Sequence, residues 1–170
     1  MLSLGFCEGE RKVGGDSMNA LVVYYSRFGN TRRVAEAIAD SMESRGAVRV
    51  MSTDELTPSD LKGSNLVVMG SPTHRMRLPE AVQSLLKALP KETLRGKSFA
   101  AFDTSYRLSA LLASFTAARK LARALRRVGG RQVVPGETFL VVEREGPLYD
   151  GEIERAMAWA ESVWRETSES

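Results

Sequence analysis

Five short apolar runs, separated by longer polar and helical segments, dominate the hydrophobic pattern of this chain. Most of the runs are continuous rather than alternating, which is typical of strands that are covered on both faces of a sheet. We therefore predict five strands, which span Ala20–Tyr25, Val48–Met51, Asn65–Gly70, Ser98–Phe102 and Phe139–Val142.

Between and after these runs, apolar residues recur at the three- and four-residue spacing of one helix face. Four such faces are present, and they begin at Val34, Val82, Leu111 and Ile153. The segment Thr53–Leu61 is ambiguous and is compatible with a short turn of helix. The alternation of strand and helix predicts a three-layer α/β fold with a five-stranded parallel sheet.

The polar residues that follow three of the strands are expected to meet at one edge of this sheet. Right-handed crossovers bring the loops after strands one, three and four to the same edge. In the strand order 2-1-3-4-5, the switch point lies between strands one and three, and ligands bind at the carboxyl ends there. The loops concerned are Ser26–Thr31, Ser71–Leu78 and Asp103–Leu108.

The first of these loops, "SRFGNT", has the composition of an anion site. The first backbone N–H groups of the following helix have no partner within the helix, and its dipole adds partial positive charge. Gly29 permits close approach, and Ser26, Asn30 and Thr31 supply side-chain donors. The loop lacks the lysine of a P-loop and the glycine spacing of a dinucleotide fingerprint. The alternative is that it is only the capped start of a helix.

Length and composition restrict the possibilities further. The 170 residues suffice for one domain. Residues 1–17 have no strand or helix period, so we predict a flexible tail or an upstream-start extension there, and one domain over 18–170. The single cysteine, Cys7, excludes an internal disulfide and favours a reducing, cytoplasmic setting. No run approaches the roughly 18 apolar residues of a membrane span.

Charge is distributed unevenly along the chain, whose formal net charge is +3. Residues 104–136 contain seven basic residues and no acidic one, whereas residues 137–170 contain nine acidic and three basic residues. Such asymmetry produces a surface field that attracts charged partners. Nucleic acid is not the expected partner, because the last third is acidic and aromatic residues are not interleaved with the basic ones.

Three stretches of the chain resemble the flavodoxin family. "VVYYSRFGNTRRVAEAIA" is similar to the phosphate-binding loop of flavodoxins, with the pattern [ST]-x-x-G-N-T after an apolar strand, and "VVMGSPTHRMRLP" is similar to the second flavin loop. "AAFDTSYR" and the C-terminal segment "GETFLVVEREGPLYDGEIERAMAWAESV" resemble a bacterial and archaeal subgroup of small flavodoxin-domain proteins. The likeness runs from about Met18 to Trp164.

The resemblance implies a flavodoxin-like fold with one FMN at the switch point. The FMN phosphate would contact the first loop, and the flavin ring would lie between the second and third loops. The cofactor-binding residues that we expect are Ser26, Arg27, Phe28, Gly29, Asn30, Thr31, Ser71, Pro72, Thr73, His74, Arg75, Met76, Asp103, Thr104, Ser105 and Tyr106. Tyr106 is the best stacking candidate in the third loop. We expect neither a catalytic side chain nor a metal site.

Three functions are compatible with these observations. The first is an electron carrier that docks to redox partner proteins, and the second is an FMN-dependent NAD(P)H oxidoreductase that acts on quinones or other small acceptors. The third is a binding module that has lost its flavin. Arginines on or beside the three loops suggest that this region attracts an anion, which would be the FMN phosphate, a phosphorylated nicotinamide cofactor or an acidic protein partner. The sequence does not predict the oligomeric state.

Overall fold

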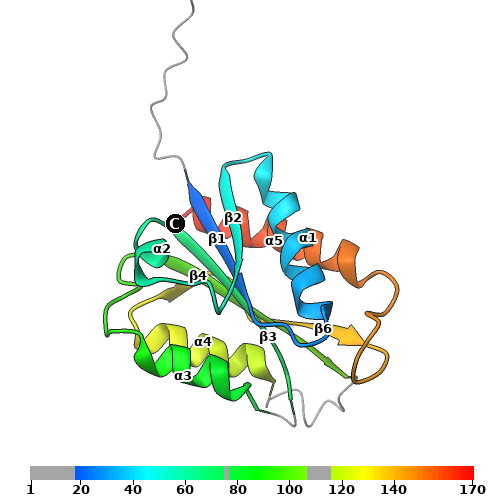
Figure 1. The fold of residues 1–170 in the computed structure, drawn as a ribbon. Coiled ribbons are helices and arrows are strands. Elements are labelled where there is room, and N and C mark those ends of the chain that lie inside the picture. Colours follow the sequence, from blue (N-terminus) through cyan, green and yellow to red (C-terminus); the bar gives the residue numbers. More distant parts are fainter. Residues whose placement is uncertain (1–17, 75–76, 107–115) are drawn as a thin grey trace, which may run out of the picture.

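Eleven helices and strands make up the part of the chain that this computed structural model describes, which is residues 18–74, 77–106 and 116–170. In chain order they are β1 (Asn19–Tyr24), α1 (Asn30–Glu43), β2 (Ala47–Ser52), α2 (Pro58–Lys62), β3 (Leu66–Pro72), α3 (Glu80–Ala88), β4 (Ser98–Tyr106), α4 (Ala117–Arg127), β5 (Arg131–Gln132), β6 (Glu137–Val141) and α5 (Glu152–Ser168) (Figure 1). The predicted tail, residues 1–17, lies outside the described residues. So does Leu111, where the third apolar helix face was predicted to begin.

The strands form one parallel sheet in the order β2-β1-β3-β4-β5, which confirms the predicted topology. Each crossover between neighbouring strands carries a helix, as parallel pairing requires. The reversal of winding lies between β1 and β3. The carboxyl ends of both strands therefore open onto the same edge, with Tyr24 opposite Gly70.

The fifth position in the sheet is shared by two segments, where the sequence predicted one. β5 pairs with the start of β4, at Ser98 and Phe99, and β6 pairs with its end, from Phe102 to Tyr106. The interruption contains Pro135, which has no backbone N–H to donate to a ladder. β6 thus reinforces the end of β4 that borders the loops.

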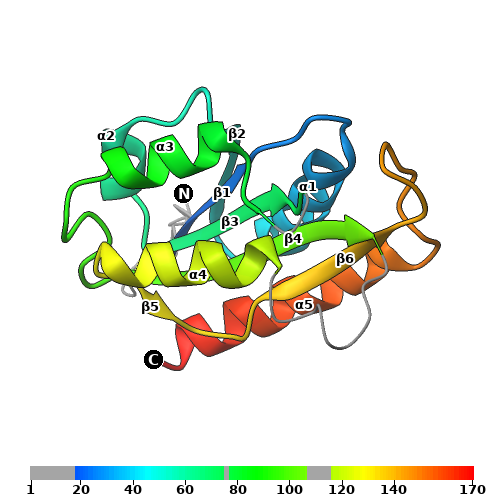
Figure 2. The same ribbon diagram turned by 90° about the horizontal axis from the view of Figure 1, so that it is seen from below.

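Helices cover both faces of the sheet. α1 and α5 pack on one face, where Val22, Val68 and Phe102 point, and α3 and α4 pack on the other, where Val67 and Phe99 point (Figure 1). The alternation follows from the two-residue period of a strand, which sends neighbouring side chains to opposite faces. Figure 2 shows α4 and α5 on opposite sides of the β5 and β6 edge.

One prediction about the loops is wrong. The third loop was expected to begin at Asp103, but β4 continues to Tyr106, with Asp103, Thr104 and Ser105 buried within the strand. β6 supplies the parallel partner that makes this extension possible. Burial is tolerated there in part because Thr104 and one oxygen of Asp103 find hydrogen-bond partners in neighbouring segments, which no local pattern reveals.

The glycine before the second loop is required by packing. A Cβ on Gly70 would lie 2.0 Å from Cζ of the Phe102 ring on the adjacent strand. Phe102 in turn makes edge-to-face contacts with Phe139 and Trp159, at centroid distances of 6.0 and 6.2 Å. This aromatic cluster supports the carboxyl edge of β3 and β4 from the α5 side.

Among the described helices, none is long and apolar enough to cross a membrane.

Candidate functional site

A cavity of about 430 Å³ lies at the carboxyl edge of the sheet, where β1, β3, β4 and β6 end. This volume falls in the range of ligand pockets. The cavity is lined by Tyr25, Ser26, Arg27, Phe28, Asn30, Thr31, Pro72, Thr73, His74, Pro79, Glu80, Thr104, Ser105, Tyr106, Val141 and Arg144. The predicted convergence of loops at the switch point is therefore present.

The turn from β1 into α1 forms one end of the cavity. The Gly29 N–H donates to Ser26 Oγ at 3.0 Å, so the Ser26 hydroxyl proton remains available to a ligand. Gly29 has a φ of 88°, and nothing lies within 4 Å of where its Cβ would be. The first turn of α1 contains no acidic residue. Its unpaired N–H groups and open space suit an anion.

Thr31, in the first turn of α1, connects this corner to β4. Its Oγ1 lies 2.8 Å from Thr104 Oγ1, and both residues are buried. The hydroxyl pair holds the start of α1 against the end of the strand. Because one of the two must accept, the other hydroxyl is the donor, and the accepting hydroxyl retains a proton for a further bond.

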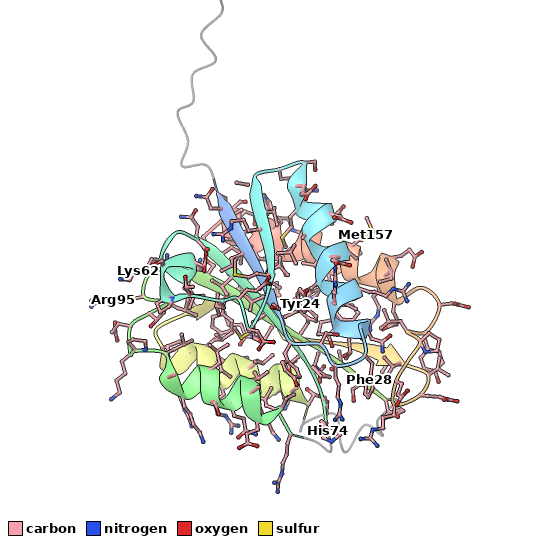
Figure 3. The ribbon with its side chains drawn as sticks, in the orientation of Figure 1. Tyr24, Phe28, Lys62, His74, Arg95 and Met157 are labelled. Carbon is pink, nitrogen blue, oxygen red and sulfur yellow. The ribbon has the colours of Figure 1, made fainter. Side chains whose placement is uncertain are left out.

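Two exposed aromatic residues border the cavity, one from the first loop and one from the end of β4. Phe28 is 41% exposed and Tyr106 is 40% exposed, so both rings are available to a ligand in the cavity. The Arg27 guanidinium lies 5.4 Å from the centroid of the Phe28 ring. Figure 3 shows Phe28 and His74 at the same end of the molecule, and both line the cavity.

The second loop is closed by a tight backbone pair. His74 N–H donates to the Arg77 carbonyl at 3.1 Å, and Arg77 N–H donates to the His74 carbonyl at 2.8 Å. Thr73 N–H donates to the Thr104 carbonyl at 2.9 Å, which continues the pairing of β3 with β4. His74 is thus held at the cavity wall. Arg75 and Met76, both predicted to contact the cofactor, lie outside the described residues.

A buried carboxylate lies behind the cavity wall. Asp103 is fully buried, and its Oδ2 accepts hydrogen bonds from Thr73 Oγ1 and, at 3.0 Å, from the Ala117 N–H at the start of α4. Burial raises the pKa of Asp103, although these donors oppose the shift. Asp103 therefore joins the second loop, β4 and α4, and it acts on the cavity by positioning Thr73.

The predicted site residues divide into three groups. Eleven line the cavity: Ser26, Arg27, Phe28, Asn30, Thr31, Pro72, Thr73, His74, Thr104, Ser105 and Tyr106. Gly29, Ser71 and Asp103 are not among the lining residues; Ser71 and Asp103 are buried in their strands. Arg75 and Met76 form the third group, which the structure does not describe.

Five lining residues were missed by the sequence reasoning: Tyr25, Pro79, Glu80, Val141 and Arg144. Val141 and Arg144 come from the end of β6 and the loop that follows it. The signal that would have found them is the parallel direction of the last strand, because its carboxyl end opens onto the same edge as the other loops. Within the described residues, no cluster of histidine, cysteine, aspartate and glutamate is arranged to hold a metal ion.

The sheet order defines a doubly wound α/β protein, with a hydroxyl-rich strand-to-helix turn and a cavity at the point where the winding reverses. Folds of this class bind ligands at that point. Residues 22–159 match the family model described as Flavodoxin, and the chain belongs to the flavodoxin family.

Individual relatives agree with this assignment. A flavodoxin from Clostridium saccharobutylicum is 28% identical over 90 residues, a match that covers 52% of this chain and 56% of that protein. A flavodoxin from the domain Archaea has a similar structure, with a TM-score of 0.70 and 24% identity over 89% of this chain and 99% of its own. Flavodoxin 2 from Bacillus cereus has a TM-score of 0.74 and 20% identity, covering 87% and 99%. The two structural similarities support the fold.

FMN is the cofactor of this family, and the cavity fits it. The phosphate end requires an anion site, and the open space above Gly29 at the acid-free start of α1 provides one. The flavin end requires aromatic and apolar surface, and the exposed rings of Phe28 and Tyr106 line the cavity. The residues present are therefore compatible with an FMN-sized, dianionic ligand.

Proposed function

We propose that this protein is an FMN-dependent electron carrier that shuttles between redox partner proteins. The observation that carries the proposal is the cavity at the switch point of a flavodoxin-family sheet. The turn from β1 into α1 lies at one end of this cavity, and exposed aromatic rings lie at its border. The bound flavin supplies the redox chemistry, by accepting electrons from one partner and passing them to another.

In this proposal the first loop holds the phosphate. The Ser26 hydroxyl is free to donate because its oxygen accepts from Gly29. The backbone N–H groups at the start of α1 and the side chain of Asn30 complete the donor set. Charge-assisted hydrogen bonds of this kind contribute about 1.5–3 kcal/mol each.

In this proposal the second loop and the end of β4 hold the flavin ring. Thr73 and His74 present polar groups at the cavity wall, and Tyr106 presents an aromatic face. Aromatic stacking adds about 0.5–1.5 kcal/mol beyond the burial of area. Phe28 shields the cavity from water on the other side. The roles of Arg75 and Met76 in this wall remain predictions.

The partner in this proposal has an acidic surface. α4 contains no acidic residue, and Arg119, Arg123, Arg126 and Arg127 on it are exposed. The N-terminus of the same helix is bonded to Thr73 and Asp103 beside the cavity. Complementary charge accelerates encounter between proteins and selects among them. We propose that the exchange occurs in the cytoplasm, as the single cysteine suggests.

An NAD(P)H oxidoreductase is the second candidate. It is favoured by the two arginines that line the cavity, Arg27 and Arg144, because a phosphorylated nicotinamide cofactor requires cations at the entrance.

Two titrations test the proposal. The apoprotein should bind FMN with quenching of flavin fluorescence, and a folded protein that takes up no FMN at millimolar excess would refute the proposal and support a flavin-free binding module. Anaerobic addition of NADPH or NADH to the FMN-loaded protein should leave the flavin spectrum oxidised. Rapid bleaching by either nucleotide alone would favour the oxidoreductase instead.

A further inference from the structure

The loop between β6 and α5 contacts the turn from β1 into α1 directly, through Asn30. Asn30 Nδ2 donates to the Glu145 carbonyl at 2.9 Å, across 115 residues of sequence. The loop is itself well ordered by backbone bonds, from Val142 N–H to the Pro147 carbonyl at 2.8 Å and from Tyr149 N–H to the Leu140 carbonyl at 3.0 Å. It therefore forms a wall beside the start of α1.

The approach of this loop to Asn30 depends on a glycine. A Cβ on Gly146 would lie 2.6 Å from both Nδ2 and Oδ1 of Asn30. Gly146 also has a φ of 108°, in a region that other residues rarely adopt. Both constraints act at Gly146, which directly follows Glu145, the residue whose carbonyl accepts from the Asn30 amide. The position of the loop and the orientation of that amide are therefore coupled.

The same loop brings a cation to the cavity. Arg144 lines the cavity, and it is exposed. Glu143 and Glu145 flank it in sequence, yet its side chain forms no ion pair or hydrogen bond with any described residue. A guanidinium group presents a planar fork of donors that matches phosphate oxygens. This fork lines the same cavity as Asn30 and Thr31 at the start of α1, and it belongs to the residue before Glu145, whose carbonyl accepts from Asn30.

We propose that the loop over residues 143–149 makes this site selective for a phosphorylated ligand, with Arg144 binding the phosphate and Gly146 allowing the loop to lie against Asn30. The inference rests on the proposed function, since it concerns the same cavity. The contact with Asn30 favours the FMN phosphate as the source, and a phosphate of a second ligand at the cavity entrance shares the same chemistry.

The first test compares FMN with riboflavin, which has the same ring and no phosphate. Dissociation constants are measured by fluorescence quenching for wild type, Arg144→Met, Arg144→Lys and Gly146→Ala. Arg144→Met should weaken FMN binding about tenfold and leave riboflavin binding unchanged, and Arg144→Lys should retain part of the preference. Gly146→Ala should also reduce the FMN preference, with folding checked by circular dichroism. Arg165→Met, at an exposed arginine on α5, is the control and should behave as wild type.

The second test separates the two phosphate sources. Binding of NADP⁺ and NAD⁺ to the FMN-loaded protein is compared by calorimetry for wild type and Arg144→Met. If Arg144→Met keeps the preference for FMN over riboflavin but loses the preference for NADP⁺ over NAD⁺, Arg144 binds a phosphate, and that phosphate belongs to a second ligand. If Arg144→Met changes neither preference while wild type binds FMN, the inference is overturned and the proposed function stands. If wild type binds no FMN, the proposed function fails first, and the inference fails with it.

Discussion

The hydroxyl of Thr31 meets the hydroxyl of Thr104 at 2.8 Å, and this buried contact joins the start of α1 to the end of β4 across 73 residues. The contact therefore links the turn from β1 into α1 to β4, whose end lines the cavity. Thr31 is therefore both a structural residue and a candidate contact of the ligand.

The first prediction concerns the stability that this pair provides. Thr31→Val and Thr104→Val should each lower the free energy of unfolding by about 1–2 kcal/mol, because each leaves one buried hydroxyl without its partner. The double variant should lose less than the sum of the two, because no unpaired hydroxyl remains. Urea unfolding of the four proteins measures the coupling. Strictly additive losses would mean that the hydroxyls do not interact.

The second prediction concerns Asn30. One of its two amide N–H donors is used by the Glu145 carbonyl, so one is left for a ligand. Asn30→Ala should weaken FMN binding about tenfold, the effect of losing one charge-assisted hydrogen bond. Asn30→Asp should weaken it further, since it places a negative charge beside the phosphate.

Asn65 provides the matched control for this experiment. Its Oδ1 accepts from the Asn19 N–H at 2.9 Å, at the amino-terminal end of β1 and β3, opposite the cavity. Asn65→Ala should leave the FMN dissociation constant unchanged. Equal affinities for wild type and Asn30→Ala would remove Asn30 from the site.

The third prediction follows from the raised pKa of Asp103. Burial makes the folded protein hold the carboxyl proton more tightly than the unfolded chain, where the pKa is near 3.8. Because the native state then binds more protons, the contribution of Asp103 to stability is greatest below about pH 3.8 and falls as the pH rises through the folded pKa. Asp103→Asn removes this dependence.

The measurement is the free energy of unfolding of wild type minus that of Asp103→Asn, at pH values from 4 upward. This difference should fall with rising pH, with a slope of at most about 1.4 kcal/mol per pH unit for one proton. Thr73→Val should extend the fall to higher pH in the Asp103-containing protein, because it removes a donor that favours the charged carboxylate and so raises the folded pKa of Asp103 further. A difference that grows with pH would show that the charged form is the favoured one.

The fourth prediction concerns the arginine that ties α5 to the edge strand. Arg155 donates to Glu137 Oε1 at 2.5 Å and to Glu152 Oε2 at 2.6 Å, and its guanidinium lies 4.7 Å from the Phe139 ring centroid. Glu152 is only 9% exposed and accepts from the Leu140 N–H of β6 at 2.6 Å. Together the two side chains form hydrogen bonds with backbone groups of β6 on its open edge, and this limits pairing of that edge with other chains.

Arg155→Met should lower the free energy of unfolding by about 2–3 kcal/mol, because it leaves Glu152 as a nearly buried charge with one partner fewer. The exposed pair of Arg165 and Glu166 is the comparison, and Arg165→Met should cost less than about 0.5 kcal/mol. Chemical denaturation of both variants gives the two values. Equal costs would mean that the Arg155 contacts are no better than a surface pair.

Much of the architecture was accessible from local pattern. The continuous apolar runs gave the positions of the five principal strands to within a few residues, and their alternation with helical segments gave the parallel topology, now confirmed. The small polar residues after Tyr25 correctly placed a strand-to-helix turn at the cavity. These features depend on periodicity and on residue-specific backbone preferences, which neighbours in sequence determine.

The extension of β4 to Tyr106 could not be foreseen in the same way. Asp103, Thr104 and Ser105 are polar, so local pattern favoured a loop. Their burial depends on partners from distant segments, namely Thr73, Thr31 and the backbone of α4. The β6–α5 loop was missed for a related reason, since its place beside α1 involves a long-range contact between Glu145 and Asn30.

The order of residues alone establishes that this chain alternates buried strands with amphipathic helices, and it predicts that the first strand leads into a turn suited to an anion. It also establishes that a basic segment precedes an acidic one. Only three-dimensional packing separates these charges, because it puts the basic α4 and the glutamate-rich α5 on opposite sides of the sheet (Figure 2). Packing also brings Arg144 to the cavity, since long-range hydrogen bonds and close contacts, rather than local preferences, decide where a loop lies.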